Sequence, residues 1–145
     1  MQQVGNLEHW GAQISHEEDI KSLLALKTWA IVGLGNNPDR AAFEVAKMLQ
    51  DKGHKIIPVH PRAEVVHGEI GYKSLSEIPI PIDVVDCFVN SNLVGRVVDE
   101  AIAIGAKAVW LQLDVIDLEA ANRAKSAGLL TVMDRCPAIE YRKQQ

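Results

Sequence analysis

The chain has 145 residues, is 48% hydrophobic and carries a formal net charge of −4. This length suits one compact domain with a substantial core, but not a binding domain plus a full catalytic domain. The acidic balance and the lack of a basic run argue against a nucleic-acid partner. Apolar stretches fall well short of the roughly 20 residues of a membrane-spanning helix, and no signal-peptide pattern is present. We therefore expect a cytoplasmic protein that binds neither membranes nor nucleic acids.

The N-terminal region divides into two parts. We expect residues 1–14 to form a flexible arm and residues 15–145 to form a single domain. Ser15 followed by Glu18 fits a capping box, which predicts a short apolar-faced helix ending near Leu26.

The segment Lys27–Pro61, KTWAIVGLGNNPDRAAFEVAKMLQDKGHKIIPVHP, is the most informative stretch of the chain. Its apolar run Trp29–Val32 predicts a buried strand. This run ends at Gly33 and Gly35, where a backbone without Cβ can turn sharply and approach a ligand closely. The free N–H groups at the start of the following helix attract anions, chiefly phosphate. The apolar face of this helix consists of Ala42, Val45, Ala46 and Leu49. A second buried strand, Ile56–Val59, follows the helix.

The segment Arg62–Pro81 is polar and rich in turn residues, so we expect a loop with little regular structure. Pro79 and Pro81 preclude a regular strand there. Beyond it, strand and helix patterns alternate to the end of the chain. The expected strands are Val84–Val89, Ala108–Leu113 and Leu129–Met133, and the expected helices run from Ser91 to Gly105, from Asp117 to Ala127, and onward from Cys136 and Pro137.

This alternation predicts an α/β fold, namely a Rossmann-like, doubly wound and mostly parallel sheet in a single domain. Ligands of such sheets bind beyond the carboxyl ends of the strands, where the topology changes direction. The glycine pattern G-x-G-x-x-P is incomplete because Pro38 replaces the third glycine. Taken alone, it also fits a tight strand-to-helix turn with no ligand.

The end of the second strand discriminates between ligands. An NAD site has Asp or Glu there to accept hydrogen bonds from the ribose hydroxyls, whereas this chain has His60 and Arg62. Cationic side chains suit a phosphorylated ribose, as in NADP or coenzyme A (CoA). NAD is therefore disfavoured.

Other reactive side chains give weaker signals. Cys136 begins a helix beside Arg135, an arrangement that favours a thiolate, although a core cysteine is the commoner outcome. Cys87 lies within an apolar strand, and two cysteines do not form a disulfide framework. We expect Asp134 to pair with Arg135 or to cap the tail helix. The five histidines show no ligand spacing, so we expect no metal site.

Four motifs in this order carry a more specific resemblance. They are VGLGNNPDR, IIPVHPR, AIAIGAKAVWLQLDV and VMDRCPAIE, within a match from about Ile20 to Glu140. The chain resembles the small stand-alone CoA-binding proteins related to the N-terminal domain of the succinyl-CoA synthetase α subunit. The resemblance implies non-catalytic binding of CoA or an acyl-CoA. Together with the strand-end loops, it gives these candidate ligand-binding residues: Gly33, Leu34, Gly35, Asn36, Asn37, Arg40, Val59, His60, Pro61, Arg62, Asn90, Ser91, Gln112 and Asp114.

Three positions depart from that family's pattern. Relatives usually carry a small hydroxyl residue at the position of Gly35, often Arg at Val89, and usually Gly at Asp114. Near the expected phosphate site, Gly35 thus removes a hydrogen-bond donor, Val89 removes a cation and Asp114 adds an anion. Because a charge-assisted contact contributes roughly 1.5–3 kcal/mol, we expect weakened binding of CoA.

Three other functions stay open on the sequence. One is an NADP-linked redox or regulatory domain. The second is the CoA-binding part of an acyl-CoA synthetase, whose phosphorylated histidine and ATP-binding partner this chain lacks. The third is a structural protein whose ligand site has decayed. Apolar surface at the tail helix is also compatible with a homodimer.

Overall fold

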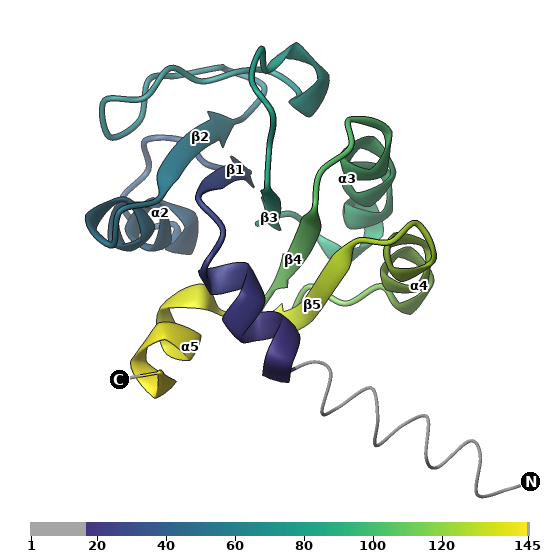
Figure 1. Ribbon diagram of the computed structural model, residues 1–145. Coiled ribbons are helices and arrows are strands. Elements are labelled where there is room, and N and C mark those ends of the chain that lie inside the picture. The colour runs from purple at the N-terminus through teal and green to yellow at the C-terminus, as the bar shows by residue number, and fades with distance from the viewer. Residues whose placement is uncertain (1–16, 145) are drawn as a thin grey trace, which may run out of the picture.

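The computed structural model describes residues 17–144 (Figure 1). It contains a five-stranded, wholly parallel sheet with the strand order β2-β1-β3-β4-β5, which confirms the predicted Rossmann-like α/β fold. The strands are β1 (Thr28–Val32), β2 (Lys55–Val59), β3 (Val84–Cys87), β4 (Ala108–Gln112) and β5 (Leu130–Arg135). The helices are α2 (Ala41–Asp51), the 3-10 turn η1 (Leu75–Glu77), α3 (Ser91–Ala103), α4 (Leu118–Ser126) and α5 (Pro137–Lys143).

Helices cover both faces of the sheet, because strands this apolar must be buried on both sides. Figure 1 shows α2 and α5 on one side and α3 and α4 on the other. The α2 side contains the two fully buried tryptophans, Trp29 and Trp110, whose ring centroids lie 5.8 Å apart. The α3 side is packed mainly with valine, alanine and leucine, together with Cys87. Cys87 is thus a buried core residue, as expected.

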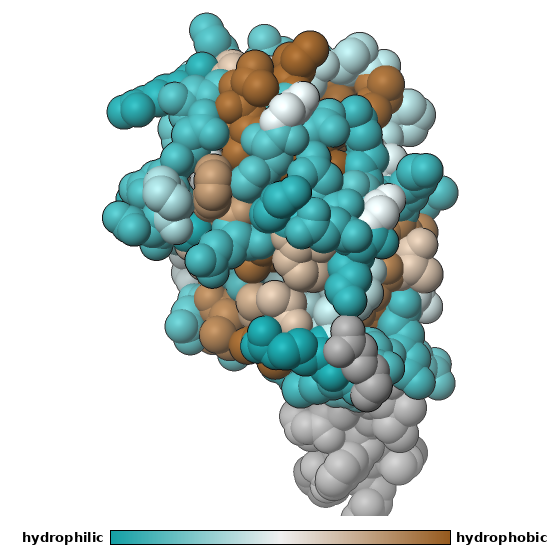
Figure 2. All heavy atoms as spheres, turned by 90° about the vertical axis from the view of Figure 1, so that its left-hand side faces the viewer, coloured by the Kyte–Doolittle hydropathy of each residue, from teal (hydrophilic) through white to brown (hydrophobic). Residues whose placement is uncertain are grey.

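The segment between β2 and β3 is irregular apart from η1 and two isolated bridges, Val59 with Tyr72 and Val66 with Glu69. It is tied to β2 because Tyr72 N–H donates to the Pro58 carbonyl and His60 N–H donates to the Tyr72 carbonyl. Figure 2 shows apolar surface at the top of the molecule, over this segment. The exposed apolar side chains of the segment are Val65, Ile70 and Ile80.

The two ends of the described chain are held together. A helix at residues 17–24 packs on the α2 side, while the expected cap Ser15 and the arm 1–14 lie outside the described residues. The Tyr141 hydroxyl of α5 lies within hydrogen-bond distance of both the Leu24 carbonyl oxygen, at 3.0 Å, and Nε2 of His54. His54 Nδ1–H donates to the Leu26 carbonyl at 2.7 Å. No helix within residues 17–144 has the length and apolarity to cross a bilayer.

Candidate functional site

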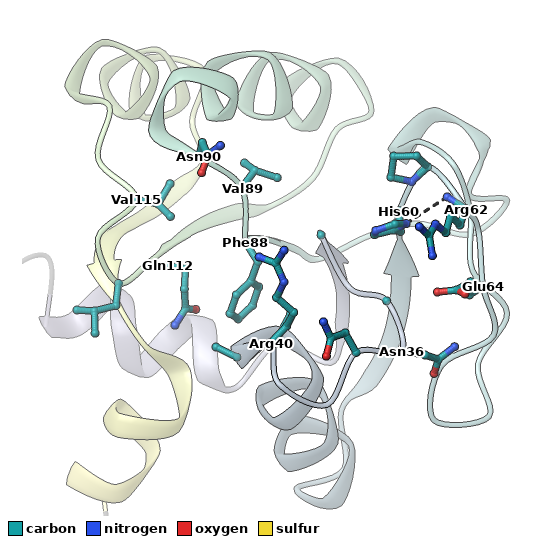
Figure 3. Close-up of a pocket in the computed structure, with 17 residues that line it drawn as sticks. Asn36, Arg40, His60, Arg62, Glu64, Phe88, Val89, Asn90, Gln112 and Val115 are labelled. Atoms are coloured by element: carbon teal, nitrogen blue, oxygen red, sulfur yellow. Dashed lines mark hydrogen bonds between the residues drawn. The ribbon is translucent and has the colours of Figure 1, made fainter.

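A cavity of about 840 Å³ lies at the carboxyl ends of the strands (Figure 3). β1 has β2 on one side and β3 on the other, so the chain changes direction at β1 and its following loop opens onto a crevice. The cavity is lined by residues at or just beyond the carboxyl ends of β1, β2, β3 and β4 and by the start of α2: Gly33, Gly35, Asn36, Asn37, Arg40, Ala41, Ala42, His60, Pro61, Arg62, Glu64, Phe88, Val89, Asn90, Gln112, Leu113 and Val115.

Gly33 allows the β1 and β3 ends to approach each other. Its φ is +99°, a conformation that L side chains rarely adopt. A Cβ at this position would lie 2.3 Å from the Phe88 carbonyl oxygen. Gly33 therefore permits both the turn and the close contact that brings the Phe88 segment to the cavity wall.

The N-terminus of α2 opens into the cavity without a cap. Arg40 is the N-cap residue, and its side chain makes no capping hydrogen bond. Phe43 N–H donates to the Arg40 carbonyl. The N–H groups of Ala41 and Ala42, which line the cavity, donate to no group within residues 17–144. Unpaired N–H groups at a helix start carry partial positive charge and bind anions. No side chain of residues 17–144 accepts a hydrogen bond from these two amides.

Charged side chains gather on the β2 side of the cavity. Figure 3 shows His60, Arg62 and Glu64 at one side, Gln112 and Val115 at the opposite side, and Arg40 between them. In the described part of the chain, neither Arg40 nor Arg62 forms a salt bridge. Arg62 N–H donates to His60 Nδ1 at 3.1 Å, so in the neutral ring Nε2 carries the proton. The β2 side thus offers the free guanidinium group of Arg62 and an imidazole N–H of His60, and Arg40 adds a second free guanidinium group in the middle of the cavity.

The opposite wall, which we call the β4 side, is mostly apolar. It consists of Phe88, Val89, Gln112, Leu113 and Val115. Gln112 is only 7% exposed, and its Oε1 has no hydrogen-bond partner among residues 17–144. A buried amide oxygen without a partner costs free energy, which a ligand donor in the cavity would recover.

The asparagines after Gly35 shape the loop. Asn37 Oδ1 accepts a hydrogen bond from Asp39 N–H, and Asn36 Nδ2 donates to the Val65 carbonyl at 2.8 Å. The loop is therefore fixed both internally and to the segment after β2. Most of the predicted ligand-binding residues line the same cavity: Gly33, Gly35, Asn36, Asn37, Arg40, His60, Pro61, Arg62, Asn90 and Gln112.

Four predicted ligand-binding residues lie outside this lining. Leu34 and Val59 are buried in the core, because the strand pleat and the turn direct them inward. Ser91 Oγ accepts a hydrogen bond from Ile116 N–H at 2.9 Å and thus fixes the loop after β4. Asp114 is exposed, and its φ of +70° is a conformation that glycine adopts more readily.

Several lining residues were missed by sequence reasoning. Phe88 is an apolar residue of an expected strand and Val115 an apolar residue of an expected loop. Nothing in the sequence pattern distinguishes an apolar residue of a cavity wall from one in the core. Glu64 belongs to a long irregular segment whose path no periodicity predicts. Ala41 and Ala42 had a usable signal, since the first N–H groups of a helix after a glycine turn are expected to face the ligand.

One expectation about an individual polar residue was wrong. The Asp134 carboxylate neither pairs with Arg135 nor caps α5; it accepts a hydrogen bond from Asp114 N–H at 2.7 Å. This bond holds two adjacent strand ends whose residues both have positive φ. Asn90 is the N-cap residue of α3 by position, but its side chain makes no capping bond. Asp117, by contrast, caps α4, accepting from Ala120 N–H at 3.0 Å.

Two further groups belong to the core instead of the cavity wall. Asp86 is completely buried with neither carboxylate oxygen hydrogen-bonded, and burial raises its pKa well above the usual range. Cys136 is half-buried and packs against the core on the α2 side. Within residues 17–144, no three His, Cys, Asp or Glu side chains are grouped so as to hold a metal ion.

Comparison with known proteins places this geometry in a family. The Bacillus subtilis protein YneT is 37% identical over 124 residues, covering 85% of this chain and 92% of YneT. A solved structure from Pyrococcus horikoshii is 40% identical, with a TM-score of 0.83 over 88% of this chain and 90% of that one. The α subunit of the ADP-forming acetate–CoA ligase II of Pyrococcus furiosus is 36% identical over 81 residues, covering 55% of this chain and 18% of that subunit. The family model described as CoA binding domain matches residues 27–142, and the chain therefore belongs to the CoA-binding domain family.

Proposed function

We propose that this protein binds coenzyme A or an acyl-CoA without catalysing a reaction. The observation that carries the proposal is the uncapped N-terminus of α2, whose free Ala41 and Ala42 amides line the cavity beside Arg40. A diphosphate fits this arrangement because helix-start amides and guanidinium groups are the usual partners of phosphate oxygens.

The β2 side suits the adenosine end of the ligand. Arg62 and the Nε2–H of His60 supply donors for a 3′-phosphate, and Glu64 is an acceptor that suits a ribose hydroxyl or an adenine amino group. No acidic residue stands directly at the end of β2, where an NAD site requires one. These features support CoA over NAD.

We further propose that the affinity is reduced relative to the family. Gly35 supplies no hydroxyl and Val89 no positive charge, and both line the cavity. Asp114 lies outside the lining, so we attribute the weakening to Gly35 and Val89. Each missing charged contact is expected to cost about tenfold in affinity or more.

Isothermal titration calorimetry with CoA, ADP, NADP and NAD tests the proposal. Arg40→Gln and Arg62→Gln should each weaken CoA binding by roughly 10- to 100-fold, the effect of losing one charge-assisted contact. Arg142→Gln is the matched control, since it removes the same charge from an exposed residue of α5 away from the cavity. No heat with millimolar CoA, or equal losses in the control, would overturn the proposal, and tighter binding of NADP than CoA would favour a redox or regulatory domain.

The similarity to the acetate–CoA ligase α subunit favours a second candidate, in which the chain is the CoA-binding part of a larger complex. The match covers only 18% of that subunit, so an ATP-binding partner would have to supply the remaining chemistry. Affinity purification of the tagged chain from its native cells tests this candidate. Recovery of a stoichiometric subunit with an ATP-binding domain supports it, and recovery of the chain alone excludes it.

A further inference from the structure

Exposed apolar side chains gather directly beside the β4 side of the cavity. The loop between β4 and α4 carries Leu113 and Ile116, which are 47% and 48% exposed, and Leu118, the first residue of α4, is 66% exposed. Leu93, in the first turn of α3, is 47% exposed. We call these four residues the apolar rim. Large apolar side chains exposed together in this way mark a binding surface more often than side chains exposed singly.

Hydrogen bonds fix the rim in place and join its two elements. Ser91, at the start of α3, accepts from Ile116 N–H at 2.9 Å and lies 3.4 Å from the Asp114 carbonyl oxygen. Asp114 N–H is held by Asp134 at 2.7 Å. The loop after β4 is therefore attached to the start of α3 on one side and to the end of β5 on the other.

The rim is continuous with the cavity. Leu113 belongs to both, since it lines the cavity and is also half exposed. Gln112 precedes it on the β4 side, buried and with an unpaired amide oxygen. A ligand that leaves the charged β2 side therefore meets a buried hydrogen-bond acceptor first and an apolar surface next.

This sequence of environments matches one part of an acyl-CoA. The pantetheine arm carries secondary amides, whose N–H groups can donate to Gln112, and it ends in a thioester to the acyl group. Resting on the proposed function, we propose that the β4 side and the apolar rim bind the acyl-pantetheine arm of an acyl-CoA whose acyl group is apolar. The ligand class is then a medium- or long-chain acyl-CoA, in preference to free CoA or acetyl-CoA.

Calorimetry with CoA, acetyl-CoA and octanoyl-CoA tests the preference. Because burial of each methylene group favours binding, the wild-type protein should bind octanoyl-CoA at least tenfold more tightly than CoA, and acetyl-CoA about as tightly as CoA. If CoA binds and octanoyl-CoA binds no more tightly, this inference is overturned while the proposed function stands. If neither ligand binds, the proposed function itself has failed.

Matched variants locate the acyl chain. Ile116→Ser with Leu118→Ser should bring the octanoyl-CoA to CoA affinity ratio close to one. The control is Ile80→Ser with Ile70→Ser. These two isoleucines are 42% and 67% exposed on the segment between β2 and β3, and their replacement should leave the octanoyl-CoA to CoA affinity ratio as in wild type. An unchanged ratio in the rim variant, or an equal fall in both variants, contradicts the inference. If the rim variant instead changes only the oligomeric state in sedimentation, the rim is a protein interface.

Gln112→Leu tests the contact with the arm. This variant should weaken CoA and octanoyl-CoA about tenfold and leave adenosine 3′,5′-bisphosphate, which has no arm, unaffected. A uniform loss for all three ligands would mean that Gln112 only supports the fold of the site, and no loss for any would mean that the arm runs elsewhere. Either result overturns the assignment.

Discussion

The substitution Gly33→Ala should destabilise the fold through the contact that shapes the cavity. Two costs add. An L residue at the φ of +99° found here is disfavoured, at a cost of about 1–2 kcal/mol. The new methyl carbon would also lie 2.3 Å from the Phe88 carbonyl oxygen, a backbone atom that moves only with the end of β3, and overpacking of this kind costs about 1–3 kcal/mol.

The expected loss is therefore about 2–5 kcal/mol of the free energy of unfolding, a large share of the roughly 5–15 kcal/mol typical of a domain. Urea unfolding followed by tryptophan fluorescence measures it, because Trp29 and Trp110 are fully buried. With a urea dependence of about 2 kcal/mol per molar, a loss of 3 kcal/mol lowers the midpoint by about 1.5 M.

Gly35→Ala is the matched control in the same loop. Gly35 does not have positive φ, and its Cβ would meet only the mobile carboxylate of Glu64 at 3.3 Å and the His60 ring at 3.5 Å. We expect its midpoint to stay within about 0.5 M of wild type, a loss below roughly 1 kcal/mol. If Gly33→Ala unfolds at the wild-type midpoint, or if both variants lose equal stability, the close approach of β1 to Phe88 does not have the energetic role given to it here.

Three other predictions follow from single side chains. Burial raises the pKa of Asp86, so the unfolded chain loses this proton first and stability falls as pH rises above about 4. Asp86→Asn should therefore gain stability relative to wild type between pH 4 and 7 (approximate limits) in urea titrations, and parallel curves would refute this. Burial lowers the pKa of His54 below 6.5, so the neutral ring's contribution to the free energy of unfolding is complete above pH 6.5 and is lost as pH falls toward the folded-state pKa. His54→Gln should remove this loss of stability at acid pH in urea titrations, and an unchanged acid limb would contradict the prediction. Gly35→Ser should tighten CoA binding about tenfold by adding a hydroxyl donor to phosphate, whereas Gly35→Ala should not; equal affinities would show that no phosphate lies at this position.

Local pattern was sufficient for the fold class and for the approximate bounds of the helices and strands. The run Trp29–Val32, the glycine turn and the helical spacing up to Leu49 each follow from residues near in sequence. From residue 27 onward, each predicted helix and strand formed within a few residues of its expected bounds. The third strand is shorter than expected because pairing stops at Cys87, after which Phe88 and Val89 turn into the cavity wall. The four motifs in their order also indicated the family, because each motif is a continuous stretch of the sequence.

The sequence by itself thus determined the fold class, the position of the glycine turn and the cationic character of the end of β2, because periodicity and turn chemistry are local properties. Only the tertiary structure decided which side chains share the cavity: Glu64, Phe88 and Val115 join it from three separate loops. It also decided that Gln112 is buried with an unpaired oxygen and that Asp134 holds the Asp114 amide. Such contacts join residues far apart in the chain, and they depend on strand order and register, which no single segment encodes.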